Sequence, residues 1–293
     1  MEEILVSYWR NGEEILNLGE HFTELLVNEF GYKTRCYSDA LSKNEISNYD
    51  SCLLVIGSRL HKRYIDSLKV PKILVWGKGK GRMGPEFEFD PLKEPYHSKL
   101  KIFAVRGPHT IKQLNLNPDT PIGDPGFLMS LIFPLERDPS KNNILYIPHH
   151  SLDKDTAINE SKKIGTDKLI NIMIDKKDFW KIYNEIISAK FILTSSLHVA
   201  ITAQSYKIPW AIHLAEGEKL NMPLKWSDVC EYLGIYENFK TVDNYEEGLK
   251  WWNDTGSKGE IPNLLPLIKS FPFPIKNERV NNIIKNLENI NYG

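Results

Sequence analysis

The sequence has few cysteines and almost no net charge. Its 293 residues include only Cys36, Cys52 and Cys230, and none of them stands at the spacing of a zinc site. So sparse and odd a set is typical of a reducing compartment and argues against a disulfide scaffold. The 37 Lys and Arg residues balance 38 Asp and Glu residues, whereas a nucleic-acid-binding domain has a basic face. We therefore expect no nucleic-acid partner and no metal site.

Long apolar runs are also missing. No stretch approaches the roughly 20 apolar residues that a membrane helix requires. The first residues, 1–5, are acidic, and their apolar run is too short for a signal peptide. These features predict a cytoplasmic protein, one that can still meet a membrane-bound substrate at the inner face of the cytoplasmic membrane. Hydrophobic residues make up 41% and charged residues 26% of the chain, which are the values of a globular protein with a sizeable core.

Three common enzyme fingerprints are absent. Segments 55–59 and 76–82 are rich in glycine and basic residues. Gly57 lets the backbone approach a ligand closely, and Arg59 follows it. Neither segment matches the G-x-G-x-x-G pattern of dinucleotide-binding proteins or a P-loop, and no G-x-S-x-G elbow occurs. The sequence therefore does not indicate nicotinamide chemistry, ATP chemistry or a hydrolase triad.

Short apolar runs alternate with amphipathic stretches along the whole chain. Continuous apolar strands with helices between them are typical of parallel sheets that are covered on both faces. The pattern predicts strands at 4–9, 51–56, 72–76, 102–105, 143–147, 169–174, 191–194 and 210–213, and helices at 20–30, 178–189, 198–206 and 280–287.

The length suits two domains joined by the polar segment 134–142, which contains two prolines. We predict an α/β protein with Rossmann-like domains at 1–135 and 143–272, and a C-terminal helix within 273–293 that crosses back to the first domain. Parallel sheets bind ligands at the carboxyl ends of their strands. If the sheets face each other, the site lies in the cleft between the domains.

The strongest local pattern is the strand-to-helix junction at 191–200. Ser195 and Ser196 precede the helix, and His198 falls in its first turn. A helix N-terminus offers free N–H groups and a positive dipole end, which suit a phosphate. Alternatively, one serine only caps the helix and His198 is a packed surface residue.

Three other strand ends carry polar residues. Arg106 has the planar fork that matches a carboxylate or phosphate, although most arginines are simply solvent-exposed. Asp124 lies in a turn with two glycines and a proline, and we interpret it as shaping that loop. His149 and His150 follow another strand. Adjacent residues on an extended chain point in opposite directions, so this pair does not easily chelate one metal.

In their order along the chain, these segments resemble the polysaccharide pyruvyl transferase family over roughly residues 4–236. Each motif is weak alone, and the ordered set is fairly specific. Two positions depart from the family pattern: Glu20 replaces the usual Asp, and Ser196 stands where some members have Arg. The matching elements are Asn17-Leu18-Gly19-Glu20, Arg106-Gly107-Pro108-His109-Thr110, Gly123-Asp124-Pro125, Pro148-His149, Ser195-Ser196-Leu197-His198 continuing to Ile208-Pro209, and Lys225-Trp226-Ser227-Asp228.

The resemblance implies a glycosyltransferase-B-like fold and a transferase of exopolysaccharide or capsule biosynthesis. Phosphoenolpyruvate would be the co-substrate, with no further cofactor, and the product a pyruvyl ketal across two hydroxyls of a saccharide, lipid-linked precursors included. The first domain would take the acceptor and the second the donor. The expected acid–base residue is His198, with His149 in reserve; the expected substrate-binding residues are Arg106, Ser195, Ser196, Leu197, Lys225, Asn17, Gly19, Gly57 and Arg59.

Two other functions fit the same architecture. A glycosyltransferase that uses a nucleotide sugar needs an acidic residue for the ribose, and Glu216 or Glu218 could serve. A non-catalytic saccharide-binding module would bind sugar without releasing phosphate. Trp226, Trp251 and Trp252 could stack on sugar rings, but core packing is the commoner use of tryptophan.

Overall fold

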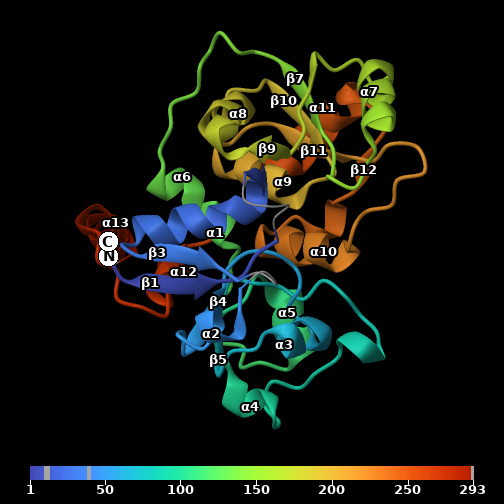
Figure 1. Ribbon diagram of the computed structural model, residues 1–293. Helices are drawn as coiled ribbons and strands as arrows, with labels where there is room; N and C mark the ends of the chain where they lie inside the picture. The colour runs from blue at the N-terminus through green and yellow to red at the C-terminus, as the bar shows by residue number, and fades with distance from the viewer. Residues whose placement is uncertain (10–13, 38–40, 292–293) are drawn as a thin grey trace.

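The fold consists of two α/β domains stacked on one another, shown in a computed structural model that describes residues 1–9, 14–37 and 41–291 (Figure 1). Each domain is built around a five-stranded parallel sheet. The expected fold, two facing Rossmann-like domains of the glycosyltransferase-B-like kind, is therefore confirmed.

The N-terminal sheet has the order β3-β1-β4-β5-β6. Numbered along the chain, this is the doubly wound order 2-1-3-4-5, whose switch point lies between β1 and β4. The strands are β1 (Glu3–Val6), β3 (Lys33–Cys36), β4 (Ser51–Leu54), β5 (Lys72–Trp76) and β6 (Leu100–Ala104). The helices are α1 (Leu18–Glu29), α2 (Lys43–Ile46), α3 (Lys62–Ser67), α4 (Tyr96–Lys99), α5 (Pro108–Leu114) and α6 (Leu128–Ile132), with short 3₁₀ turns η1 (Pro85–Phe87) and η2 (Pro125–Phe127).

The C-terminal sheet repeats this winding. Its order, β12-β11-β10-β7-β8, is again 2-1-3-4-5 when read from the other edge, and its switch point lies between β7 and β10. The strands are β7 (Ile144–Ile147), β8 (Lys168–Leu169), β10 (Phe191–Thr194), β11 (Trp210–His213) and β12 (Thr241–Val242). The helical elements are α7 (Lys154–Lys163), η3 (Lys176–Asp178), α8 (Phe179–Ile187), α9 (Leu197–Ser205), α10 (Pro223–Tyr232), η4 (Tyr236–Asn238), α11 (Tyr245–Asp254) and η5 (Gly256–Lys258).

One predicted strand is wrong in part. The apolar run at 169–174 is not a single strand, because Asn171 accepts a hydrogen bond from the backbone of Met173 and turns the chain. Its first residue belongs to β8, and its last two belong to β9 (Met173–Asp175). β9 pairs antiparallel with β2 (Ile15–Asn17) of the N-terminal half. This small ribbon joins the two domains beside the first helix.

The C-terminal segment returns to the first domain. At α12 (Leu265–Lys269), the carbonyl of Leu267 accepts a hydrogen bond from the Trp76 indole. Phe271 then packs edge-on against Phe30 and Trp76. The last helix, α13 (Glu278–Asn291), contacts α6 and α12 (Figure 1). The chain therefore crosses back to the first domain before residue 273, the predicted start of the returning segment.

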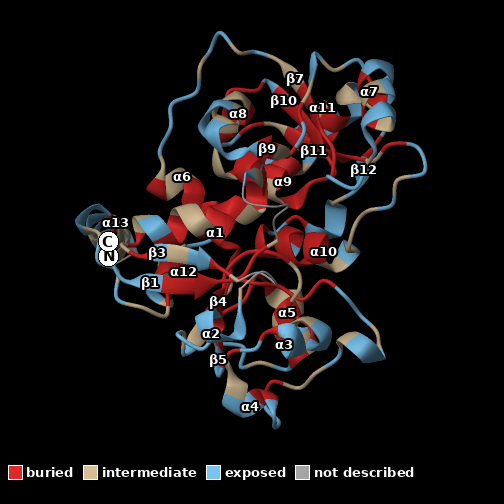
Figure 2. Cartoon of the chain, in the orientation of Figure 1, coloured by how far each residue is buried: buried red, intermediate tan, exposed pale blue. Residues whose placement is uncertain are grey.

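Burial is densest where the domains meet. Figure 2 shows buried residues along the central strands of both sheets and in the helices α1, α9 and α10 between them. One apolar cluster includes Val6 and Phe22 of the first domain together with Leu193 and Ile201 of the second, while a smaller cluster covers the other face of the N-terminal sheet. A continuous core across the seam gives the two domains a defined relative position.

Candidate functional site

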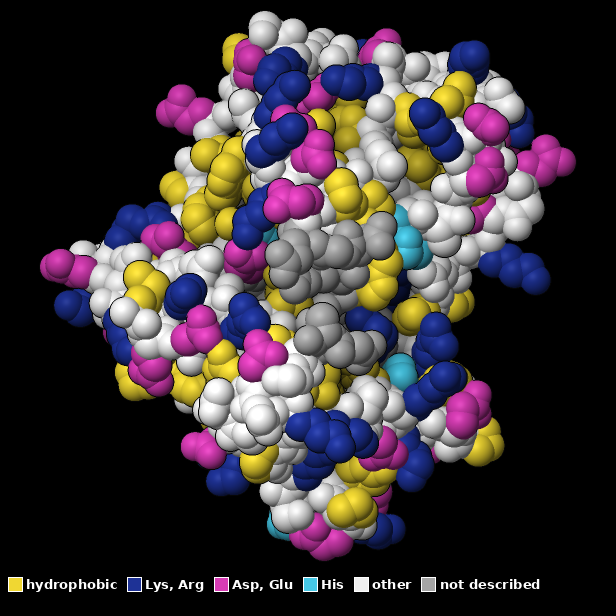
Figure 3. Space-filling model, in the orientation of Figure 1, with side chains coloured by type: hydrophobic (Ala, Val, Ile, Leu, Met, Phe, Trp, Pro, Cys, Tyr) yellow, Lys and Arg dark blue, Asp and Glu magenta, His cyan; other side chains and the backbone are white. Residues whose placement is uncertain are grey.

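A cavity of about 420 Å³ lies between the domains. It opens where the carboxyl ends of β1 and β4 face those of β7 and β10, so the switch points of the two sheets meet there. Figure 3 shows the two lobes meeting at a waist, with histidine, Lys and Arg side chains close to it. The lining residues are Trp9, Asn17, Glu20, Gly57, Ser58, Arg59, Arg82, His149, His150, Ser151, Ile172, Ser196, Leu197, His198, Asn221, Met222 and Lys225.

The C-terminal domain presents the N-terminus of α9 to this cavity. Ser196 is the N-cap, but its hydroxyl makes no capping hydrogen bond. Leu197 follows as the first helical residue, and its apolar side chain is buried. The free N–H groups of the first turn and the positive end of the helix dipole favour an anion at this point.

Ser195 is placed differently from Ser196. Its hydroxyl donates to Glu218 at 2.8 Å and accepts from the backbone N–H of His149 at 2.7 Å. It does not line the cavity. Ser195 therefore ties the β10–α9 turn to the β7 end and to the loop after β11. Its expected role in substrate binding stays a prediction, and in this structure its hydroxyl makes these two hydrogen bonds within the C-terminal domain.

His198 lies at the cavity wall, one residue into α9. Its Nε2 atom is buried and sits 3.6 Å from the Asp124 carboxylate of the first domain. That distance is too long for a hydrogen bond but close enough for an electrostatic pair. Gly19 of α1 packs against the opposite side of the ring. Gly19 does not itself line the cavity, so its contact is with His198 rather than with a ligand.

Lys225, in the first turn of α10, supplies a cation from the C-terminal domain. Only 7% of the residue is exposed. Burial, reinforced by Arg106 and opposed by Glu20 and Glu218, lowers the pKa of Lys225 to about 7. Among the described residues, no carboxylate lies within ion-pair distance of its ammonium group. An anionic ligand would relieve this unfavourable burial.

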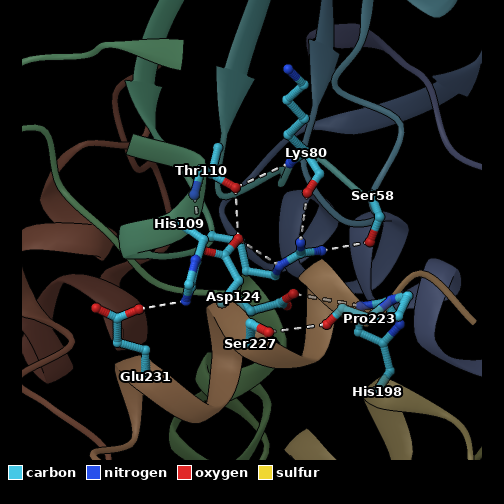
Figure 4. Close-up of polar contacts among 11 residues, drawn as sticks. Ser58, Lys80, His109, Thr110, Asp124, His198, Pro223, Ser227 and Glu231 are labelled. Carbon is cyan, nitrogen blue, oxygen red and sulfur yellow. Dashed lines mark hydrogen bonds and ion pairs between the residues drawn. The ribbon is translucent and has the colours of Figure 1, made fainter. Parts of the chain in front are cut away.

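Arg106, an expected substrate-binding residue, lies behind the cavity wall in the structure. Its side chain is fully buried and lies outside the cavity. The guanidinium donates to Asp228 at 3.1 Å and to the Ser58 hydroxyl at 2.6 Å. Asp228 also accepts from the backbone and hydroxyl of Thr110. In Figure 4, Ser58 and Thr110 lie on one side of this network and α10, with Ser227 and Glu231, on the other. Arg106 therefore links the domains, and each of its three nitrogens donates one hydrogen bond within the protein, to Asp228, Ser58 and the Lys80 carbonyl.

The two adjacent histidines lie at the end of β7. His149 Nδ1 is 2.8 Å from the Ser151 hydroxyl, and Nε2 is 2.8 Å from the Asn221 amide. Burial, reinforced by Lys225, His150 and His198, lowers the pKa of His149 to about 3. A neutral ring with both nitrogens engaged is a poor proton donor. His150 instead stacks on Trp9, with ring centroids 4.8 Å apart.

The first domain contributes the remaining wall. Asn17 caps α1 by accepting from the backbone of Glu20 at 3.3 Å. Gly57, at the end of β4, has φ +103°, and an added Cβ would lie 2.8 Å from the Glu20 carboxylate. Arg59 lies over the Tyr64 ring with 4.8 Å between the guanidinium carbon and the centroid. Arg82 also lines the cavity, so the first domain contributes two arginines to its lining and the second contributes Lys225.

Several lining residues were not among the sequence-based candidates. Trp9, Ser58, Arg82, His150 and Asn221 belong to this group. The first four lie on strand ends or in the basic loop at 76–82, so their positions were detectable in principle. Asn221 precedes α10 in a loop without a motif. Among the described residues, no group of three or more His, Cys, Asp or Glu side chains is arranged to hold a metal ion.

The fold and the site together define a two-domain, doubly wound α/β protein with a cationic cavity at its facing switch points. The family model for polysaccharide pyruvyl transferase matches residues 31–215. The chain belongs to this family and is a transferase of polysaccharide modification.

Comparisons with other proteins add little detail. None of the curated proteins matches. An uncharacterized protein of Klebsiella pneumoniae subsp. pneumoniae NTUH-K2044 is 16% identical, with 82% of this chain and 93% of that chain covered and a TM-score of 0.40. A variant of the wall teichoic acid polymerase TagF is 8% identical, with coverages of 99% and 88% and a TM-score of 0.41. An alpha1,3-fucosyltransferase is 10% identical, with coverages of 98% and 90% and a TM-score of 0.30.

Proposed function

We propose that the chain transfers a pyruvyl group from phosphoenolpyruvate to two hydroxyls of a saccharide, forming a ketal and releasing phosphate. The observation that carries this proposal is the cavity at the facing switch points. It combines a helix N-terminus, three cationic side chains and a histidine, in a member of a family named for pyruvyl transfer.

Binding of the donor would use the two sources of positive charge. Phosphoenolpyruvate carries a phosphate and a carboxylate close together. The N–H groups of the α9 first turn and the Ser196 hydroxyl suit one of these anions. Lys225, from α10, and Arg59, from the β4 end, suit the other. The cavity therefore offers more than one cationic contact for a small ligand with two anionic groups.

The chemistry needs one proton donor at the methylene carbon. Protonation of the methylene by His198 makes it a methyl group and leaves an oxocarbenium-like centre at the adjacent carbon. One sugar hydroxyl attacks that carbon, the C–O bond to phosphate breaks, and the second hydroxyl closes the ketal. Of the two hydroxyl protons, one replaces the proton that His198 gave and the other leaves with the phosphate. This scheme requires no cofactor.

The acceptor would enter from the first domain. Glu20 lines the cavity from α1, and its carboxylate accepts a hydrogen bond from the backbone of Trp9 at 3.2 Å. A carboxylate at this position can accept a hydrogen bond from a sugar hydroxyl. The stacked rings of Trp9, from the first domain, and His150, from the second, also line the cavity and offer a flat surface of the kind that packs on a sugar ring.

We place the reaction in the cytoplasm, and at the inner membrane face when the acceptor is lipid-linked. Among the helices that the structure describes, none has the length and apolar character needed to cross a bilayer.

The nucleotide-sugar alternative has less support. Glu218, one of the two residues considered for the ribose, accepts from the Ser195 hydroxyl and from the backbone of Ala215. Its oxygens are therefore already engaged within the domain. Glu216 is exposed and does not line the cavity.

Phosphate release tests the proposal. The protein is incubated with phosphoenolpyruvate and a panel of galactose-, glucose- and mannose-type acceptors, and inorganic phosphate is measured. We expect release that depends on both an acceptor and the protein. The proposal would be wrong if no acceptor gave phosphate from phosphoenolpyruvate while a uridine or guanosine diphosphate sugar released its nucleotide. That result would favour the glycosyltransferase alternative.

A further inference from the structure

The imidazole of His198 belongs to the second domain but is held by residues of the first. On one side lies Gly19 in the first turn of α1. A Cβ added to Gly19 would come within 2.4 Å of the Cβ, Cγ and Nδ1 atoms of His198. Real Cβ contacts are not that short, so any larger residue would push the ring away. Gly19 therefore provides the space in which the ring sits.

On the other side lies Asp124, at the start of η2. Its carboxylate is fully buried. One oxygen, Oδ1, accepts a hydrogen bond from Gly126 N at 2.9 Å. The second, Oδ2, has no hydrogen-bond partner among the described residues and points at His198 Nε2, which is also buried and unpartnered (Figure 4). Buried polar atoms normally find partners, and these two face each other.

The charge balance supports the same pairing. Burial alone would raise the pKa of Asp124, but the nearby His198 and Arg106 hold it below its usual value. Asp124 is therefore a carboxylate at neutral pH. The cation that Arg106 contributes is already bonded to Asp228. Two buried carboxylates thus share one buried guanidinium, and His198 is the group placed to supply a second positive charge.

We propose that Asp124 is a positioning residue that fixes the orientation and tautomer of His198, and that Gly19 lines the other side of the space that holds the ring. At 3.6 Å from Nε2, an ionised carboxylate attracts an N–H and repels a lone pair on that nitrogen, so it favours the ring form that carries a proton on Nε2. Because Nε2 is buried against Asp124, Nδ1 is the nitrogen left to exchange protons with a ligand. The N-terminal domain thereby controls the acid–base group that the C-terminal domain carries.

The orientation and tautomer of the His198 ring can be tested without any assumption about the reaction, whereas their effect on the rate rests on the proposed function. Two separate measurements therefore test the two statements. The first is the ¹⁵N spectrum of histidine-labelled protein, in which His198→Gln assigns the two ring signals. The second is the steady-state rate of phosphate release.

In the spectrum, we expect wild-type His198 to show Nε2 protonated and Nδ1 as the nitrogen that loses its proton. Asp124→Asn keeps an oxygen for the Gly126 N–H, so the loop is preserved, but its amide can donate as well as accept. We expect the preference for Nε2–H to be lost in Asp124→Asn and the ring signals to shift in Gly19→Ala. Asp119→Asn, an exposed change in the same domain, is the matched control and should leave both signals in place.

In the rate assay, Asp124→Asn should lower kcat by at least about tenfold, towards the ~10⁴-fold loss that a wrong tautomer causes in a Ser-His-Asp triad. The KM for phosphoenolpyruvate should change by less than about threefold, since Asp124 does not touch the ligand. Should Asp124→Asn fail to fold, Gly19→Ala gives the same readouts from the other side of the ring. Unchanged His198 signals in either folded variant would overturn the positioning proposal. A wild-type protein that gives the expected spectrum but releases no phosphate would overturn the proposed reaction instead.

Discussion

The seam, which is the interface between the two domains, has a closed part and an open part. The closed part is the buried network of Arg106 and Asp228, the open part is the cavity, and α10 contributes residues to both. Asp228 and Lys225 lie one turn apart on α10. Asp228 is fully buried and bonded to Arg106 and Thr110 of the first domain. Lys225 faces the cavity and has no anionic partner within ion-pair distance among the described residues. The closed part fixes the distance between the domains, so the open part can hold unpaired charges at defined positions.

The largest effect is expected at His198, on the open side. His198→Ala removes the proposed proton donor and should lower kcat for phosphate release by about 10²–10⁴-fold. The circular dichroism spectrum should stay close to wild type, whereas the unfolding midpoint should fall, because the buried Asp124 carboxylate loses its neighbouring imidazole. A folded variant with near-normal turnover would exclude His198 from the mechanism.

Breaking the closed side should affect stability first. Asp228→Asn leaves the Arg106 guanidinium buried without its counter-charge, and losing one partner of a buried pair costs about 3–5 kcal/mol. Urea unfolding should show this decrease in the free energy of unfolding. Glu45→Gln, which breaks an ion pair with Arg35 that is half exposed on both sides, is the control and should change it far less, because solvent screens the pair. Equal effects of the two substitutions would mean that Arg106–Asp228 does not lock the seam.

Lys225 should make donor binding depend on pH. With a pKa near 7 in the free protein, its ammonium is charged below pH 7 and loses its proton above. The phosphate of the donor is already fully ionised above pH 7, because its second pKa is near 6. The Kd for phosphoenolpyruvate, measured by titration calorimetry, should therefore rise between pH 7 and 9, by up to about tenfold per unit.

Lys225→Arg provides the control for this dependence. Arginine stays charged over the whole range, so the rise in Kd above pH 7 should flatten, even if the fit to the ligand is poorer. A wild-type Kd that does not change between pH 7 and 9 would show that Lys225 does not contact the donor.

The smallest effect is expected at the outer edge of the closed part. His109 Nε2 lies 2.6 Å from the Glu231 carboxylate, which is 43% exposed. Because solvent screens such a pair, Glu231→Gln should reduce the free energy of unfolding by no more than about 1 kcal/mol. Turnover should remain unchanged. If Glu231→Gln lowered the free energy of unfolding as much as Asp228→Asn, the surface pair rather than the buried network would be what holds the domains together.

The sequence predicted the sheets better than the seam. Short apolar strands such as 51–56 and 191–194 are recognisable because the hydrophobic pattern of a strand and the turn residues at its ends can be read from the local sequence. The run at 169–174 misled because the hydrogen bond of Asn171 divides it between two sheets. Strand ends and motifs selected eight of the residues that line the cavity, and their roles in binding and catalysis stay predictions: Asn17, Gly57, Arg59, His149, Ser196, Leu197, His198 and Lys225.

What could not be predicted depends on distant partners. Arg106 follows a strand, as a ligand-binding residue would, but its partner Asp228 lies 122 residues further along the chain. Asp124 was interpreted as shaping a loop, and it does accept a hydrogen bond from Gly126 within that loop. Its second oxygen meets His198 only because the domains pack together. Local patterns carry no information about such contacts.

The most direct test of the cationic cavity is a binding titration at pH 7 with phosphoenolpyruvate, wild-type protein and Lys225→Met. The wild type should bind phosphoenolpyruvate, and the variant should bind it at least about tenfold more weakly, because a buried charge-assisted contact is lost. If phosphoenolpyruvate binds neither protein while a uridine or guanosine diphosphate sugar binds the wild type, pyruvyl transfer at this cavity is contradicted.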